Sequence, residues 1–363
     1  MYELAAKVTP EDIFALSRFA FIELARCGVS AVGEFHYLHH APNGAPYADR
    51  LELADAVIRA AREVGIRITL LRVLYQRAGA GLPPEGAQKR FSDAQLDDAF
   101  SDIEALMTRH ANDPLVRIGI APHSVRAVSR EALSEIAAFT RTRALPVHMH
   151  VAEQRREIDE CLAEHGLRPI ELLHELGLLD ERFVAVHATH LEAHEARMLG
   201  APRAFACICR TTERDLGDGL PNIARLRAEG ARLCVGADSH ASSDPFEEAR
   251  AIELDERSRT EARHVAADAT ELLRALGEDG YASIGITEAN DEVYFDADDI
   301  ALVGAEDLDD AVIWAGTPRA VREVRVAGRA IVENGRHAQQ DEARAAYLEA
   351  LSRLGLHSGV ESS

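Results

Sequence analysis

Short apolar segments and longer amphipathic segments alternate along most of this chain. The short segments are rich in Val, Ile and Phe, which is typical of buried β-strands, whereas the longer ones repeat apolar residues at helical spacing. The predicted strands are residues 29–35, 66–74, 116–121, 146–151, 183–187, 204–208 and 232–236. The predicted helices between them include residues 51–63, 93–109, 130–143, 169–176 and 221–229.

The order of these elements predicts a parallel β-sheet in an α/β fold. Strands separated by helices form either a doubly wound sheet or a closed (β/α)8 barrel of the TIM type. Polar side chains follow the ends of many strands, as in barrel enzymes, and no Gly-rich dinucleotide-binding turn follows a strand. We therefore predict a barrel. Because the pattern gives seven strands and the chain opens with a helix, we expect the first strand of the barrel to be missing.

The two ends of the chain differ from this alternating region. Thr9-Pro10 predicts the start of a helix, since a threonine hydroxyl caps helices and proline is favoured in their first turn. Towards the C-terminus we predict short strands at 293–295 and 311–314, a hairpin at 321–335, a helix at 341–354 and a frayed tail at 358–363. The chain thus divides into a barrel lacking strand 1 (1–285), a small β subdomain (286–340), and a C-terminal helix and tail (341–363).

Composition and charge narrow the class of protein. The chain has 363 residues and a formal net charge of -21, which argues against nucleic acid and anionic membranes as partners. An anionic small molecule would need local cations to bind. No apolar run approaches a membrane span and no signal peptide opens the chain, so we expect a cytoplasmic protein. The five cysteines form no CxxC pair and are expected to be reduced thiols.

The segment VHMHVAEQ at 147–154 is the strongest candidate for chemistry. His148 and His150 point to one face of a strand, which is the interior of a barrel. His150 lies nearer the C-terminal end and is the better metal ligand of the two. Glu153 follows where the strand becomes a loop, and there it could act as a general acid and base. The alternative interpretation is that this segment simply places two polar residues in the core, where their hydrogen-bonding groups find partners.

Two further strand ends carry polar residues that metals bind. His187 ends the strand in VAVHATHL. Taken alone, this histidine is better explained as a core residue bonded to backbone, and only the polar residues on adjacent strands favour a role in metal binding. Asp238 follows the strand in VGADSHASSDPFEE, where an acid could ligate a metal, accept a proton or cap the next helix. Together His150, His187 and Asp238 offer the nitrogen and oxygen ligands of a zinc hydrolase.

Residues that could bind substrate lie after two other strands. Arg126, in IAPHSVRAV with His123, offers a planar guanidinium that suits a carboxylate, though a surface salt bridge is as good an explanation. GEFHYLHH at 33–40 gathers Tyr37 and three histidines, which could contact substrate or pack over the barrel mouth. Cys207 and Cys209 alternate with Ile208 as strand residues and are predicted to be small core residues.

Taken together, these motifs resemble the formimidoylglutamate deiminases, amidohydrolase-superfamily enzymes of bacterial histidine breakdown. The matching stretches are EFHYLHH, APHSVRA, HMHVAEQ, VHATHL, TTERDLGDG, GADSHASSDPFEE and VAGRAIVENGRH. The resemblance implies hydrolysis of N-formimino-L-glutamate to N-formyl-L-glutamate and ammonia, by a homodimer with one zinc ion per subunit.

The resemblance also implies roles for residues. His150 and Asp238 would hold zinc, with His187 as a further ligand or an electrostatic partner of bound water. Asp238 would accept a proton from that water, and Glu153 would carry protons to the leaving ammonia. The substrate carboxylates would be held by Tyr37, His123 and Arg126.

Two departures from the family stand out. The family carries a His-x-His pair on its first strand, and this chain has no equivalent; Arg210 stands where we expect proline. Three alternatives follow: the chain is a fragment of an active deiminase, it is a pseudoenzyme without a metal site, or His36, His39 or His40 substitutes as ligand. We expect the chain as written to have little or no activity. A related deaminase acting on a cyclic amidine is a further alternative, although only 5% of the residues are aromatic and could stack on a flat base.

Overall fold

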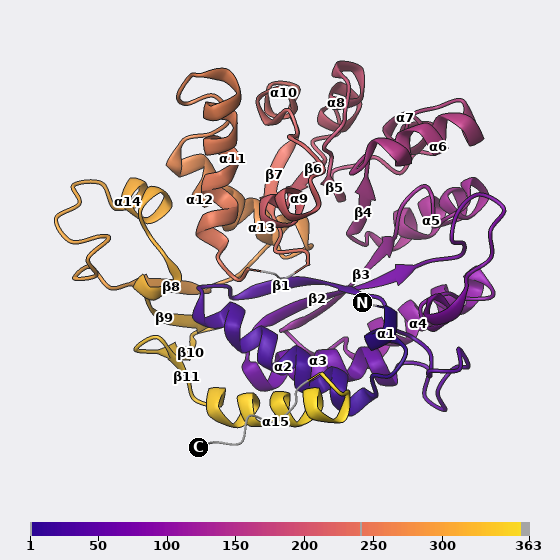
Figure 1. Cartoon of the computed structure of the whole chain (residues 1–363), viewed down its shortest axis with the longest axis horizontal. Helices are drawn as coiled ribbons and strands as arrows, with labels where there is room; N and C mark the ends of the chain where they lie inside the picture. Colours follow the sequence, from indigo (N-terminus) through magenta and orange to yellow (C-terminus); the bar gives the residue numbers. More distant parts are fainter. Residues whose placement is uncertain (1, 240–241, 357–363) are drawn as a thin grey trace.

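A seven-stranded parallel sheet, curled into part of a barrel and covered by helices on its outer side, forms most of the protein (Figure 1). The computed structural model describes residues 2–239 and 242–356, so the tail predicted at 358–363 lies outside the described residues. The strands of this sheet, in spatial and sequence order, are β1 (Ala31–His36), β2 (Arg67–Leu74), β3 (Val116–Pro122), β4 (Val147–Val151), β5 (Phe183–His187), β6 (Phe205–Ile208) and β7 (Arg232–Val235).

The helices of the barrel region follow or precede these strands. They are α1 (Tyr2–Ala5), α2 (Pro10–Arg26), α3 (Glu52–Val64), α4 (Leu96–Arg109), α5 (Arg130–Arg143), α6 (Arg155–His165), α7 (Pro169–Glu175), α8 (Ala193–Gly200), α9 (Arg210–Leu216), α10 (Ile223–Ala228), α11 (Pro245–Thr260), α12 (Ala269–Leu276) and α13 (Glu278–Ser283), with a 3-10 turn η1 (Gly86–Arg90). No helix in the described ranges is both long and apolar enough to cross a bilayer.

The seven predicted strands are all present, within about two residues of their predicted bounds. Every residue of β2, β4, β5 and β6 is buried, which explains why these strands read as continuous apolar runs. Register fixes the height of side chains along the sheet: His150 of β4 pairs with Val186 of β5, and Val151 pairs with His187. The C-terminal ends of β4 and β5 therefore lie side by side.

The sheet is open, because β1 and β7 are its two edges and no described strand pairs with both. A cavity of about 570 Å³ is lined by residues of β1, including Gly33 and Phe35, and by residues 235–238 at the end of β7 and just after it. Most of β1 is only half-buried and Gly33 is exposed, unlike the fully buried strands beside it. The prediction of a (β/α)-barrel sheet without one of its strands is confirmed.

Helix α2 begins as its sequence predicts. The Thr9 hydroxyl accepts a hydrogen bond from the backbone N–H of Asp12 at 3.2 Å, and the Asp12 carboxylate accepts one from the N–H of Thr9 at 3.1 Å. This reciprocal pair is a capping box. Helix α15 (Gln340–Arg353) packs against α2, where the rings of Phe19 and Tyr347 stack 4.4 Å apart.

A second, antiparallel sheet lies beside the barrel at the C-terminal end (Figure 1). Its strands, in spatial order, are β11 (Arg336–His337), β10 (Arg329–Glu333), β9 (Val321–Val326) and β8 (Glu292–Phe295), and the 3-10 turn η2 (Pro318–Ala320) precedes β9. The hairpin predicted at 321–335 is therefore confirmed.

The prediction of a strand at 311–314 is wrong, because this segment belongs to helix α14 (Leu308–Trp314). The Asp307 side chain caps α14 by accepting from the N–H of Asp310. The helix buries Val312 and Ile313 and contacts α11 and α12. A cap and tertiary burial thus override the β-preference of the sequence Ala-Val-Ile-Trp.

Candidate metal centre and active site

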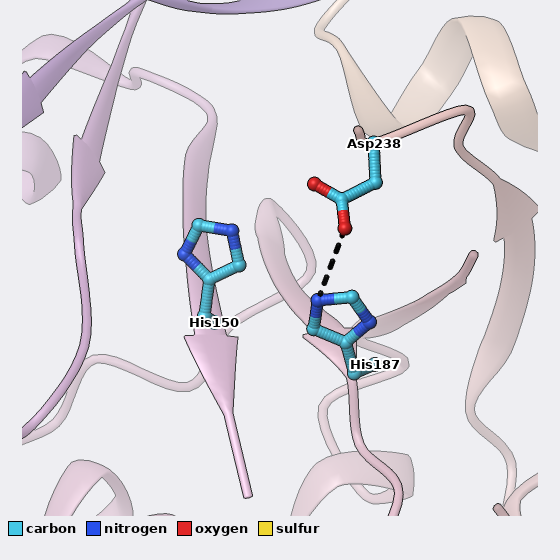
Figure 2. Close-up of side chains that lie close together, drawn as sticks. All are labelled: His150, His187 and Asp238. Atoms are coloured by element: carbon cyan, nitrogen blue, oxygen red, sulfur yellow. Dashed lines mark ion pairs between the residues drawn. The ribbon is translucent and has the colours of Figure 1, made fainter. Parts of the chain in front are cut away.

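Three side chains from separate strand ends converge on one point (Figure 2). His150 lies on β4, His187 is the last residue of β5, and Asp238 follows β7 by three residues. One ligand atom from each lies within 4.8 Å of the other two. Both His187 and Asp238 leave their strands in the left-handed backbone region, with φ of 70° and 42°, and such outliers are enriched at functional sites.

His150 presents one free ring nitrogen. Its Nδ1 donates to the backbone carbonyl of His123 at 2.9 Å, because that carbonyl can only accept. Burial, together with the charge of His187, lowers the pKa of His150 to about 4, so the ring is neutral near pH 7. The lone pair of Nε2 is therefore available to a metal.

His187 is held from the other side by a buried carboxylate. Its Nδ1 lies 3.2 Å from Oε1 of Glu213, whereas its Nε2 is buried and has no hydrogen-bond partner in the described residues. Nε2 lies 3.7 Å from Oδ2 of Asp238 and 3.6 Å from Oε1 of Glu153. Burial disfavours the charged ring, but the hydrogen bond to Glu213 and the charges of Glu153 and Asp238 outweigh it and raise the pKa of His187.

These residues fit a metal ion. A buried imidazole nitrogen without a partner is costly unless a cation or a donor meets it, and here it faces a second imidazole and a carboxylate. Two nitrogens and one oxygen form the ligand set of many catalytic metal sites, which leave a coordination position open. The group His150, His187 and Asp238 can therefore hold a metal, as the sequence predicts.

Glu153 lies beside this group without belonging to it. The side chain is 22% exposed and comes from the turn between β4 and α6. Burial is the main cause that raises the pKa of Glu153, and the neighbouring carboxylates of Asp218 and Asp238 add to it. A carboxyl group that protonates more easily than usual, next to a metal group, is suited to transfer protons.

Two of the predicted substrate residues, His123 and Tyr37, lie next to one another, and His123 also lies beside His150. The His123 ring lies 4.9 Å from His150 and 5.8 Å from Tyr37, measured between ring centroids. Arg126 is half-buried, and its positive charge contributes to lowering the pKa of His123, after burial and His150. Within 2–239 and 242–356, its guanidinium makes no ion pair with a carboxylate. An uncommitted guanidinium of this kind can bind an anionic ligand.

The other histidines singled out from the sequence lie outside the metal group. His148 contacts the Ser283 carbonyl through Nε2 at 2.9 Å. His39 and His40 bond to the carbonyls of Val73 and Ser92. None of them, nor His36, belongs to the candidate metal group found among the described residues, so the alternative that one of the three replaces a missing ligand is not supported.

Two residues near the site were given no role from the sequence. Glu213, in the first turn of α9, contacts His187, and Asp218 accepts from the Gln154 amide at 3.2 Å. Both belong to TTERDLGDG, which the resemblance had marked as a matching stretch without assigning it a role. The signals in the sequence were that stretch and, for Asp218, the Gly217-Asp218-Gly219 turn, which is typical of an active-site loop.

Comparisons with known proteins agree with this geometry. Residues 1–324 match the sequence model of the amidohydrolase family. This chain belongs to the amidohydrolase family. A formimidoylglutamate deiminase from Pseudomonas aeruginosa is 35% identical over 98% of this chain and 81% of its own length.

Solved structures of amidohydrolases share the fold. One from Brucella melitensis is 33% identical, with a TM-score of 0.92 over 98% of this chain and 81% of that one. An adenosine deaminase from Xanthomonas campestris with bound zinc has a TM-score of 0.83 over 98% of this chain and 78% of its own. At 21% identity, the second likeness concerns the fold alone.

Proposed function

We propose that this amidohydrolase is a zinc-dependent hydrolytic deaminase that converts N-formimino-L-glutamate and water to N-formyl-L-glutamate and ammonia. The observation that carries the proposal is the convergence of His150, His187 and Asp238 beside Glu153, with an uncommitted guanidinium on the same side of the barrel. The 35% identity to a formimidoylglutamate deiminase supports the choice of substrate.

The three ligand residues would hold zinc, whose Lewis acidity makes water nucleophilic near neutral pH. Asp238 is partly exposed and lies 3.7 Å from His187, so it can take a proton from the attacking water. Glu153 lies 3.6 Å from the same Nε2 atom of His187 and can deliver a proton to the departing nitrogen. The formimino carbon exchanges its double bond to the terminal imino nitrogen for a double bond to the oxygen of water and keeps its bond to the glutamate nitrogen. The terminal nitrogen takes up the two protons of the water and leaves as ammonia.

The negative charge of the protein determines what kind of residue must bind the substrate. The protein carries a formal charge of -21, so a dianionic substrate is repelled at long range and must be bound by a local cation. Arg126 would supply a planar guanidinium for one carboxylate, and the neighbouring side chains Tyr37 and His123 would contact the substrate beside the metal group. A flat cyclic amidine has no carboxylate for this guanidinium to bind.

The test measures ammonia release by the purified chain at saturating Zn²⁺, with formiminoglutamate, formiminoglycine and a cyclic amidine such as cytosine. Zinc-dependent release that favours formiminoglutamate supports the proposal, and it overturns the expectation from the sequence that the chain as written is nearly inactive. Preference for the cyclic amidine, or no zinc-dependent release from any of the three, rejects the proposal for this chain. Arg126→Met should lower kcat/KM for formiminoglutamate by about 10- to 100-fold, since it removes a charge-assisted contact. Arg130→Met, which removes an exposed pair with Glu175, should leave kcat/KM unchanged.

A further inference from the structure

Arg210 is a buried arginine at the position where the family resemblance predicts proline. The residue is 2% exposed and opens helix α9. Its Nε donates to Oδ2 of Asp255 at 2.7 Å, and its Nη1 donates to the carbonyl of Gly219 at 3.2 Å and to Oε2 of Glu213. All three contacts of this guanidinium are therefore directed to fixed acceptors inside the protein.

Glu213 divides its two oxygens between different partners. Oε2 accepts from Arg210, whereas Oε1 accepts from the backbone N–H of Cys209 at 3.0 Å and lies 3.2 Å from Nδ1 of His187. The carboxylate is 1% exposed, so no solvent competes for either oxygen. The position of the guanidinium consequently determines which oxygen faces the histidine.

We infer that Arg210 is a positioning residue for His187, acting through Glu213. By holding Oε2, it keeps Oε1 directed at Nδ1–H of His187 and leaves Nε2 as the nitrogen that faces His150 and Asp238. Hydrogen bonds to the outer nitrogen of a metal-ligating histidine set its orientation and its affinity for the metal. The inference rests on the metal group of the proposed function, and it concerns the ligand rather than the substrate.

A second contact extends this role to the neighbouring turn. Arg210 donates to the Gly219 carbonyl, and the adjacent Asp218 binds the side chain of Gln154, the residue after Glu153. One guanidinium therefore joins the helix that orients His187 to the turn that lies beside Glu153. A purely structural arginine would stabilise the fold without affecting His187.

Arg214 provides a matched control. It lies on the same helix and pairs with the same Asp255, through Nη2 at 2.7 Å, but its other contact is Glu247 rather than Glu213. Replacing Arg214 therefore removes an arginine from α9 and a bond to Asp255 while leaving the bond between Glu213 and His187 intact.

The experiment compares Arg210→Met, Arg210→Lys and Arg214→Met in the full chain. Two readouts are used: Zn²⁺ affinity by competition with a chelator, and the Nδ1–H signal of His187 in ¹⁵N-histidine NMR, recorded without metal. Arg210→Met should weaken Zn²⁺ binding by about 10- to 100-fold and shift the Nδ1–H signal. Arg210→Lys should recover part of the loss, and Arg214→Met should behave as the wild type within about twofold.

Removal of Arg210 leaves Glu213 buried without its cation and could unfold the protein. The double variant Arg210→Met/Glu213→Gln avoids that buried charge and serves as the second test. If Arg210 acts through Glu213, the double variant binds Zn²⁺ as weakly as Glu213→Gln alone. Two results overturn the inference. The first is a folded Arg210→Met variant whose Nδ1–H signal and Zn²⁺ affinity are unchanged. The second is a double variant whose loss of Zn²⁺ affinity equals the sum of the losses in Arg210→Met and Glu213→Gln.

The two proposals fail differently. The NMR signal needs neither metal nor substrate, so a chain that releases no ammonia can still confirm the role of Arg210. Conversely, an active deaminase whose His187 signal does not respond to Arg210→Met would leave the proposed function standing and reject this inference.

Discussion

The imidazole rings of His150 and His187 lie nearly parallel, with 21° between their planes and 5.6 Å between their centroids. They come from neighbouring strands, and each is bound on its Nδ1 side, by the His123 carbonyl and by Glu213 respectively. Both Nε2 atoms are thereby left on the side where Asp238 approaches. The metal group is thus already oriented by the protein.

Asp238→Asn tests the anionic member of this group. The variant should lower Zn²⁺ affinity by at least about tenfold and abolish ammonia release, because an amide is a weaker ligand and accepts no proton. Asparagine tolerates the left-handed backbone at this position, so the melting temperature should hardly change. Zinc titration and calorimetry measure both effects, with Asp298→Asn, an exposed aspartate, as control. Unchanged zinc affinity would remove Asp238 from the ligand set.

Glu153→Gln separates proton transfer from metal binding. We expect kcat to fall by about 100- to 10,000-fold, since the amide cannot carry a proton, while zinc affinity stays within about threefold of wild type. The control is Asp159→Asn, an exposed residue of α6. A parallel loss of zinc would show that Glu153 is a ligand instead, contrary to the mechanism proposed above.

Acid stability should depend on Asp93. Burial would raise the pKa of this carboxyl, but the charge of Arg72 and the hydrogen bonds from His40 and Arg72 lower it well below its usual value. Because the folded pKa lies below the unfolded one, the stabilisation exists above about pH 4 and is lost as the pH falls. Asp93→Asn should cost on the order of 3 kcal/mol at neutral pH.

Urea unfolding at several pH values tests this relationship. The stability difference between wild type and Asp93→Asn should narrow from about pH 5 to about pH 3. Asp215→Asn, at an exposed position of α9, should show no such trend. A difference that stays constant over this range contradicts the prediction.

The capping box of α2 gives a prediction about local stability. Thr9→Ala removes the hydroxyl that accepts from Asp12, and should destabilise the protein by about 1 kcal/mol. Ser17→Ala, in the middle of the same helix, should be neutral or slightly stabilising because alanine favours helix. Chemical denaturation measures both, and equal effects would refute the capping role.

Much of this structure could be predicted because its signals are local. The strands of the barrel are continuous apolar segments of the sequence. His150, His187 and Asp238 each stand at or just after the end of such a segment, so their position at strand ends could be predicted. Other features depend on distant contacts. Glu213 lies 26 residues from His187 along the chain, and nothing in its local sequence indicates a partner. Helix α14 likewise forms because Val312 and Ile313 are buried against other helices, which no window around residues 311–314 reveals.

The open side of the sheet has a consequence for the dynamics of β1. Its backbone amides point alternately towards β2 and away from it, and the outward set has no partner strand in the described part of the chain. Amide protons without such partners exchange with deuterium at a low free-energy cost, whereas those of β4, hydrogen-bonded between β3 and β5, require a larger opening. We therefore expect the amides of β1 to exchange faster than those of the inner strands β4 and β5, which carry His150 and His187, whereas Asp238 follows the other edge strand, β7, and lies beside the open side.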